Sequence, residues 1–308
     1  MAIDARLSLH KLEVLDTVVR LGGVCRAADH LGVAQPVVSG HIRSLEERLQ
    51  TKLFYRSGSQ LRLTAAGRSV HLWALELLRQ TRELSRELDS VRLGIEGSVT
   101  LAASMTIGSY RLPPLLSRFQ AGRPSVDIRV DIIDAAHAIA DTEAGINDFS
   151  VVSIATPPDT PCLLPECVGR EDLLLVSSRE GAPRGEGPFD VSELSSLPFI
   201  EAQRGSLRRQ FTDHLVGEVG LAHRRVIMEL GHPEAMKRVV SAGLGVSWLF
   251  RDSVRHEIER GELREIKVSG VELSGPVYLI RRKDRVLSPI HEELVSELRS
   301  FMAQPAAA

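Results

Sequence analysis

The stretch that decides the fold reads AADHLGVAQPVVSGHIRSLE and runs from Ala27 to Glu46. Its second half predicts a helix over 35–49, because Val38, Ile42 and Leu45 recur at the three- and four-residue spacing that places side chains on one helix face. The opposite face carries a hydroxyl, a guanidinium and little bulk, from Pro36, Ser39, Gly40 and Arg43. Such a face is typical of a helix that contacts base edges in the DNA major groove.

Two shorter helices are predicted before this one. Apolar residues at helical spacing indicate a helix over 9–21, which ends at Gly22, and a second helix over 24–31, which ends at Gly32. Three short helices with tight turns between them have the rhythm of a helix-turn-helix.

A hairpin is predicted directly after the third helix. Residues 52–56 and 61–64 are typical of two short strands joined by a polar turn. Arg56 and Arg62 flank the tip, in position to contact phosphates without reading the base sequence. A small helical bundle with an unrelated hairpin is the alternative interpretation of this region.

The stretch from Ala27 to Glu46, with LFYR at 53–56 and LTAAG at 63–67, resembles the signature of LysR-type transcriptional regulators. The resemblance implies DNA contacts from the recognition helix and from the wing, namely Gln35, Pro36, Ser39 and Arg43, and Arg56 and Thr64. Three departures from the family pattern stand out. Gly23 and Cys25 replace the usual Ser or Thr around the start of the second helix. Ala34 replaces the usual Ser or Thr, which removes a side-chain N-cap with a typical value of about 1 kcal/mol. Gly40 replaces a common arginine and so removes one contact to DNA.

A long helix is predicted over 64–93, where Val70, Leu77, Leu84 and Val91 repeat every seven residues. The interleaved set is Ala74, Thr81 and Leu88. A seven-residue repeat is typical of a coiled-coil seam, so we expect a homo-oligomer: a dimer through this helix, or a homotetramer of two dimers. The alternative is a helix packed on its own chain, because Ala74 and Thr81 make the seam weak. The segment 94–97 is expected to end the helix and act as a hinge.

Composition indicates a soluble protein of more than one domain. The chain has 308 residues, of which 43% are hydrophobic and 25% charged. No apolar run approaches the roughly 18 residues of a membrane span, and the charged N-terminal residues do not resemble a secretion signal. The three cysteines, Cys25, Cys162 and Cys167, lack the spacing of zinc or redox motifs, so we expect a cytoplasmic protein without metal or cofactor.

Charge is distributed unevenly along the chain. There are 14 Lys and Arg against 11 Asp and Glu up to Gly97, and 24 against 29 beyond it. Residues 35–68 contain six basic and two acidic side chains, a bias that suits a polyanion. An ordinary solvated face with a small positive excess would look the same.

The C-terminal two-thirds predict an α/β domain of two lobes. Strand and helix patterns alternate over 98–155 and again over 173–249, and a strand at 275–282 and a helix at 288–303 close the chain. Three motifs in this half are RLPP at 111–114, GSLR at 205–208 and VSAGLGV at 240–246. With them this half resembles the LysR-type effector domain, which is itself similar to periplasmic binding proteins. The expected fold class is therefore a multi-domain chain: an all-α-rich winged helix-turn-helix over 1–63, a linker helix over 64–93, and an α/β two-lobed effector domain over 97–304. Lobe I is expected at about 97–168 and 271–304, and lobe II at about 169–270.

Ligands of such sheets bind at the carboxyl ends of strands. The residues at those positions are Ser104, Met105, Thr106, Ser153, Gln203, Ser206 and His232. All but Met105 carry groups that suit a small polar or carboxylate effector, although each alone is more often a helix cap. The resemblance also implies an effector between the lobes, in contact with Ser104, Thr106, Ser153 and Ser206. Trp248 replaces a small or aliphatic residue there, which affects the shape of the pocket.

The sequence thus predicts a regulator that binds double-stranded promoter DNA and a small-molecule effector, without catalytic residues. A solute-binding protein whose N-terminus only oligomerises is one alternative, and a hydrolase or transferase on the α/β lobes is another. No catalytic constellation can be identified for the second. Deletion of residues 1–93 separates these hypotheses, because only a regulator would lose its activity.

Overall fold

The computed structural model describes residues 7–57, 60–93, 97–183, 185 and 187–304. The chain divides into two compact units, one ending at Leu93 and the other beginning at Gly94. Each unit is described by itself. Most of the predicted hinge, residues 94–96, lies outside the described residues.

The first unit contains the predicted helices and hairpin. Its elements are α1 (Leu9–Leu21), α2 (Val24–Leu31), α3 (Gln35–Leu49), β1 (Phe54–Ser57), β2 (Gln60–Leu63) and α4 (Ala65–Leu93). Gly22 and Gly32 end α1 and α2 in the left-handed conformation, with φ of 64° and 65°, which glycine adopts without strain. Leu15, Val38 and Leu45 are fully buried between the helices. The apolar stripe predicted for α3 therefore faces the core.

The helix α4 begins tightly against the hairpin. A Cβ atom at Gly67 would lie 2.0 Å from the carbonyl oxygen of Leu53, so only glycine fits this approach. Ala74 and Leu78 are buried in the same core, with Val70 and Leu77 partly buried against it. The first half of the predicted seam thus packs on its own unit, as the alternative interpretation held.

The second half of the seam is different. Leu84 and Leu88 lie one helical turn apart, with 56% and 60% of their surfaces exposed. Two adjacent exposed leucines form an apolar stripe that its own unit does not cover.

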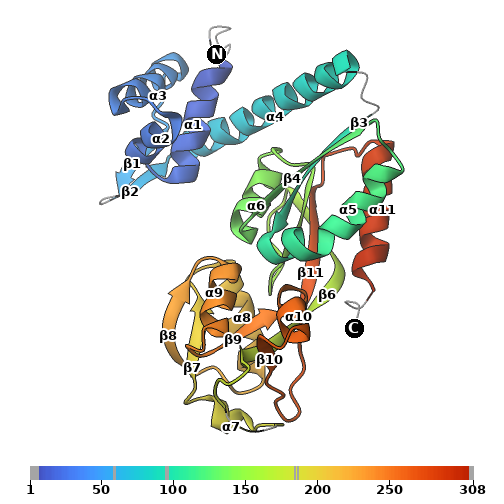
Figure 1. The fold of residues 1–308 in the computed structure, drawn as a ribbon. Helices are drawn as coiled ribbons and strands as arrows, with labels where there is room; N and C mark the ends of the chain where they lie inside the picture. Colours follow the sequence, from blue (N-terminus) through green and yellow to red (C-terminus); the bar gives the residue numbers. More distant parts are fainter. Residues whose placement is uncertain (1–6, 58–59, 94–96, 184, 186, 305–308) are drawn as a thin grey trace. The chain divides into compact units, whose positions relative to one another are not determined.

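The second unit is built on one mixed sheet with the strand order β4-β3-β5-β11-β6-β9-β7-β8, and β10 pairs with β6. The strands are β3 (Gly97–Ser104), β4 (Val126–Ile133), β5 (Phe149–Ser153), β6 (Leu163–Ser178), β7 (Pro198–Ala202), β8 (Arg225–Leu230), β9 (Val246–Phe250), β10 (Leu263–Glu265) and β11 (Leu273–Arg282). The helices are η1 (Ile107–Arg111, a π-helical turn), α5 (Leu112–Ala121), α6 (Ala135–Glu143), α7 (Val191–Leu194), α8 (Leu207–Glu218), α9 (Pro233–Ser241), α10 (Arg251–Glu259) and α11 (Pro289–Met302). Figure 1 shows two lobes joined by the long strands β6 and β11.

Helices cover both faces of the sheet in each lobe. In the first lobe, α5 and α11 pack on one core and α6 on another. In the second lobe, α8 covers one face, and α9 and α10 cover the other. This is the two-lobed α/β architecture expected from the sequence. None of the helices in the described part of the chain combines the length and apolar character that a bilayer span requires.

Four elements differ from the prediction. The strand β6 was expected only over 173–177, because 163–172 mixes Pro165 with charged residues and lacks clear alternation, yet it pairs with β11 along this whole stretch. The helix α10 follows β9 without a loop and is mostly polar, so its pattern is concealed. The short α7 and β10 also escaped prediction.

Candidate nucleic-acid interface and ligand cavity

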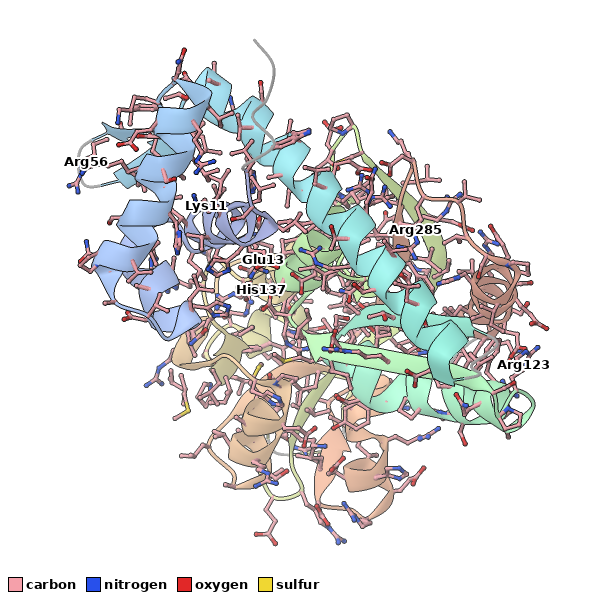
Figure 2. The ribbon with its side chains drawn as sticks, turned by 90° about the horizontal axis from the view of Figure 1, so that it is seen from above. Lys11, Glu13, Arg56, Arg123, His137 and Arg285 are labelled. Atoms are coloured by element: carbon pink, nitrogen blue, oxygen red, sulfur yellow. The ribbon has the colours of Figure 1, made fainter. Side chains whose placement is uncertain are left out.

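The face of α3 opposite the core is open to solvent. Its predicted contacts are all exposed, namely Gln35, Pro36, Ser39 and Arg43. Arg56 and Arg62 are exposed on the hairpin, and Figure 2 shows Arg56 at its outer edge, pointing away from the helices. Thr64 is half-buried and serves as a cap: its hydroxyl donates to the Lys52 carbonyl at 2.7 Å and accepts from the Gly67 amide at 2.9 Å.

A hollow of about 600 Å³ lies between α3 and the hairpin. Among the predicted residues, Pro36, Ser39, Arg43 and Arg56 line it, whereas Gln35, Arg62 and Thr64 do not. Lys52 also lines it, a contact that the sequence interpretation did not name. Three cations around a hollow bounded by a helix and a hairpin favour a phosphate backbone as the occupant.

The Glu46 carboxylate fixes the hairpin to α3. It accepts hydrogen bonds from the Lys52 ammonium at 2.6 Å and from the Leu53 amide at 2.9 Å. Burial tends to raise the pKa of Glu46, but these hydrogen bonds outweigh it and hold the pKa below its usual range. The ion stays charged, so Arg43 on the helix and Arg56 on the hairpin are presented together.

Two of the departures from the family pattern, Ala34 and Gly40, can be located on the recognition helix. Ala34 is the N-cap of α3 and makes no side-chain hydrogen bond to the first turn, as predicted. A Cβ at Gly40 would meet nothing within 4 Å, so the surface there is open.

The second unit contains a cavity of about 400 Å³ between its lobes. Six of the seven predicted residues line it: Ser104, Met105, Thr106, Ser153, Gln203 and Ser206. His232 is not among the lining residues. Its Nδ1 instead accepts from the Glu234 amide at 3.2 Å and caps α9.

Several hydroxyls of the cavity already have partners. Ser206 caps α8, accepting from the Arg209 amide at 3.1 Å and donating to the Gln203 carbonyl at 2.7 Å. Ser153 donates its proton to the Glu171 carboxylate, which leaves its oxygen to accept from the cavity side.

The sequence interpretation missed two charged residues here. Arg208, on the first turn of α8, lines the cavity and stacks over the Phe250 ring at 5.1 Å. Glu171, on β6, lies directly behind Ser153 and is only 3% exposed. Arg208 stands within the Gly205–Arg208 motif, two residues after Ser206, which is a signal that could have found it. Glu171 carries no such signal, because its part of β6 was not recognised as a strand.

Burial dominates the ionisation of Glu171. It raises the pKa, and the nearby carboxylate of Asp252 acts in the same direction, whereas the Ser153 hydrogen bond and the charges of Arg111 and Arg208 oppose it. The net result is a pKa of about 7. Near neutral pH the side chain is therefore divided between acid and carboxylate.

The π-helical turn η1 carries polar contacts between the lobes. Tyr110 accepts from the Lys237 ammonium at 3.1 Å, and the Arg111 guanidinium lies 3.5 Å from the Asp252 carboxylate. Isolated π-helical turns occur often at functional sites. Thr106 lines the cavity, and η1 begins at the next residue. A ligand in the cavity would therefore affect the contacts that η1 makes between the lobes.

The structure also brings together a serine, a histidine and an aspartate. The Ser288 hydroxyl lies 2.7 Å from His291 Nδ1, and His291 Nε2 lies 2.9 Å from the Asp148 carboxylate. None of the three lines either cavity, and Asp148 is also paired with Arg285. The row therefore links β5, which begins next to Asp148, to α11 within the first lobe. In the described part of the chain, no cluster of His, Cys, Asp and Glu could hold a metal, and all three cysteines are unpaired thiols.

In comparisons with known proteins, one family model matches the N-terminal part of the chain and another matches the C-terminal part. A family model described as LysR substrate binding domain matches residues 92–303, and one described as bacterial regulatory helix-turn-helix protein, lysR family, matches residues 9–68. The RuBisCO operon transcriptional regulator of Allochromatium vinosum is 28% identical over 301 residues, 98% of this chain and 97% of that protein.

Solved structures share the fold. Full-length CbnR in complex with its target DNA has a TM-score of 0.61 at 20% identity, covering 96% of this chain and all 100% of that one. The regulatory domain of CcmR from Synechocystis PCC6803, in complex with 2-PG, has a TM-score of 0.60 at 22% identity, covering 67% of this chain and 98% of that one.

Proposed function

Because the chain belongs to the LysR family of transcriptional regulators, we propose that it binds promoter DNA through α3 and the hairpin, and that a small polar or anionic metabolite in the cavity between the lobes controls this binding. The family and its relatives are regulators and not enzymes. The observation that carries the proposal is the hollow between α3 and the hairpin. It places Arg43, Lys52 and Arg56 around one concave surface next to an uncovered helix face.

The proposal gives the residues of this surface two roles. Ser39 reads base edges from the N-terminal half of α3, the end at which a recognition helix enters the major groove, and Arg43 does so from the next turn. Arg56 and Arg62 contact phosphates, which positions the protein without reading sequence. Gln35, Pro36 and Thr64 stay predictions from the family resemblance. The complex of CbnR with its target DNA supports this use of the fold.

The effector half is proposed to bind its ligand through Ser104, Met105, Thr106, Ser153, Gln203 and Ser206. The six converge on one cavity, and the CcmR regulatory domain in complex with 2-PG supports a ligand site in this kind of domain. His232, which does not line this cavity, stays a prediction from its place between a strand and the following helix. A ligand that binds one arrangement of the lobes more tightly shifts the population toward it, and so changes how the DNA-binding units are presented.

We further propose the domain division made from the sequence, with 1–63 for DNA, 64–93 for dimerisation and 97–304 for the effector. The exposed Leu84 and Leu88 supply the dimer contact. A tetramer of two such dimers is proposed as the larger assembly. A regulator of bacterial promoters works where the chromosome lies, so the proposal places the chain in the cytoplasm.

The proposal is tested by a footprint of the full chain on the DNA beside its own gene. We expect protection there and none on random duplex of the same length. The affinity should fall about 10³-fold or more between 50 and 200 mM salt, because phosphate contacts release counterions. A chain lacking residues 1–93 should lose all protection. Equal affinity for random and promoter DNA, or protection that survives the deletion, would contradict the proposal.

A further inference from the structure

The guanidinium of Arg208 has one edge without a partner. Its Nη1 donates to the Thr106 hydroxyl at 3.3 Å. Its Nε and Nη2 share another edge of the group, both are buried, and neither has a hydrogen-bond partner among the described residues. No acidic side chain in that part of the chain forms an ion pair with Arg208. Two parallel N–H groups therefore lie buried and unused in a residue that lines the cavity.

The same edge binds carboxylates elsewhere in this protein. Arg299 donates from Nε and Nη2 to the two oxygens of Glu166 at 2.7 and 2.9 Å. Arg282 does the same with Asp284 at 2.9 and 2.5 Å. The Nε and Nη2 donors match the spacing of the two carboxylate oxygens, which is why this bidentate pairing is common. At Arg208 the donor geometry is present and the acceptor is missing.

Leaving this edge unpaired is unfavourable. Burial lowers the pKa of Arg208, only partly offset by the charges of Glu171 and Glu201, which means that the cation is held without sufficient compensation. The Glu171 carboxyl is committed to Ser153 and does not reach the guanidinium with an ion pair. An anion entering the cavity would remove this cost and gain two charge-assisted hydrogen bonds.

The charges around the cavity limit the ligand to one negative charge. Arg208 is the only lysine, arginine or histidine among the described residues that line it, and Asp134 lines it too. Glu171, behind Ser153, has one buried oxygen without a partner, so a second negative charge on the ligand would face Asp134 and Glu171, and no second cation lines the cavity among the described residues. Leu207, Phe211 and Phe250 supply apolar surface for the rest of the molecule.

We propose that the effector is a small monocarboxylate with an apolar body of a few carbons, and that Nε and Nη2 of Arg208 bind its two carboxylate oxygens. This rests on the proposed function and names the class of ligand that the same cavity takes. Arg208 thereby becomes the residue that determines specificity. Arg208 also donates a hydrogen bond to Thr106, the residue directly before η1. A ligand bound to Arg208 would therefore act on a contact between the lobes.

The test measures the melting temperature and the calorimetric Kd of the full chain with named probes. These are acetate, propionate, butyrate, pyruvate, lactate and benzoate, with propionamide, butyramide and benzamide as neutral matches and inorganic phosphate as the alternative anion. We expect at least one monocarboxylate to bind and its amide to bind at least tenfold more weakly. Arg208→Met should weaken that carboxylate about 100-fold, because two charge-assisted hydrogen bonds are lost. Arg208→Lys, which keeps the charge but not the fork, should recover only part of the affinity.

The matched control is Arg204→Met. Arg204 lies in the turn just before α8 and its side chain is 78% exposed. Its Nε is paired to Glu229 at 2.8 Å and it does not line the cavity, so its loss should leave carboxylate binding unchanged. The proposal is overturned if no monocarboxylate binds, if phosphate binds more tightly than all of them, if amide and acid bind alike, or if Arg208→Met keeps the wild-type Kd. Promoter binding is measured on the same samples. If the wild-type chain binds a carboxylate but shows no binding to promoter DNA, only the proposed function is contradicted. If it binds promoter DNA but no carboxylate, only the ligand assignment is contradicted.

Discussion

Replacing Asp148 with asparagine is expected to lower the free energy of unfolding of the second unit by about 3 to 5 kcal/mol, the range found when one partner of a buried ion pair is removed. The Asp148 side chain is 0% exposed and lies 2.6 Å from the Arg285 guanidinium and 2.9 Å from His291. It also accepts from the Thr100 amide at 2.7 Å. Asparagine offers one acceptor oxygen and no charge, so the Arg285 guanidinium and the His291 ring would both lose the carboxylate that they contact.

The ionisation of Asp148 also makes the free energy of unfolding of the second unit depend on pH. Burial tends to raise the pKa of Asp148, but the hydrogen bond from His291, the charge of Arg285 and the Thr100 amide outweigh it and lower the pKa. A carboxyl with a lower pKa in the folded state stabilises the fold above its unfolded pKa, and loses this contribution as pH falls through the folded value. The difference between wild type and Asp148→Asn should therefore be complete at pH 7 and shrink below about pH 4.

Urea unfolding of the wild type and of Asp148→Asn, at pH 7 and below about pH 4, measures this difference in the free energy of unfolding. Asp127→Asn is the matched control, because Asp127 is exposed on β4 and its replacement should change stability by no more than about 0.5 kcal/mol. A loss for Asp148→Asn as small as that of the control would show that the buried row with His291 does not stabilise the lobe.

Leu84→Asp and Leu88→Asp are each expected to convert the proposed dimer to a monomer. Both leucines are more than half exposed on one face of α4, and a charge in a coiled-coil seam would have to be desolvated on association. A monomer contacts one half-site only, so affinity for the promoter should fall about 100-fold or more. Size-exclusion chromatography with light scattering measures the mass.

The control for these variants is Leu72→Asp. Leu72 is 67% exposed, but it lies twelve residues before Leu84, roughly 120° around the helix at 100° per residue. It should leave the dimer intact. A dimer that persists in both Leu84→Asp and Leu88→Asp would exclude this seam as the contact.

The DNA-binding unit could be predicted almost to the residue, because its signals are local. Glycines at Gly22 and Gly32 stop two helices, and one apolar stripe orients α3. The hydroxyls at the strand ends of the second unit were also predictable, since the topology of parallel strands brings them to one edge.

The remainder depends on contacts between distant residues. Asp148 and His291 are separated by 143 positions, and no local pattern pairs them. The pKa of Glu171 arises from its burial in a strand whose sequence does not alternate. The free edge of Arg208 is a property of its surroundings, because the sequence shows an arginine but not which of its donors lack a partner.

The central claim is that α3 reads the DNA sequence, whereas the hairpin contacts only the phosphate backbone of the DNA. A comparison of Arg43→Ala with Arg56→Ala tests this claim most directly. Both side chains are exposed and line the same hollow, so either loss should leave the fold intact. The measurement is the ratio of affinities for promoter and random duplex at one salt concentration. We predict that Arg43→Ala lowers this ratio by about 1 to 3 kcal/mol, roughly 5- to 150-fold, whereas Arg56→Ala weakens both affinities and leaves the ratio unchanged. An unchanged ratio in Arg43→Ala would contradict the claim.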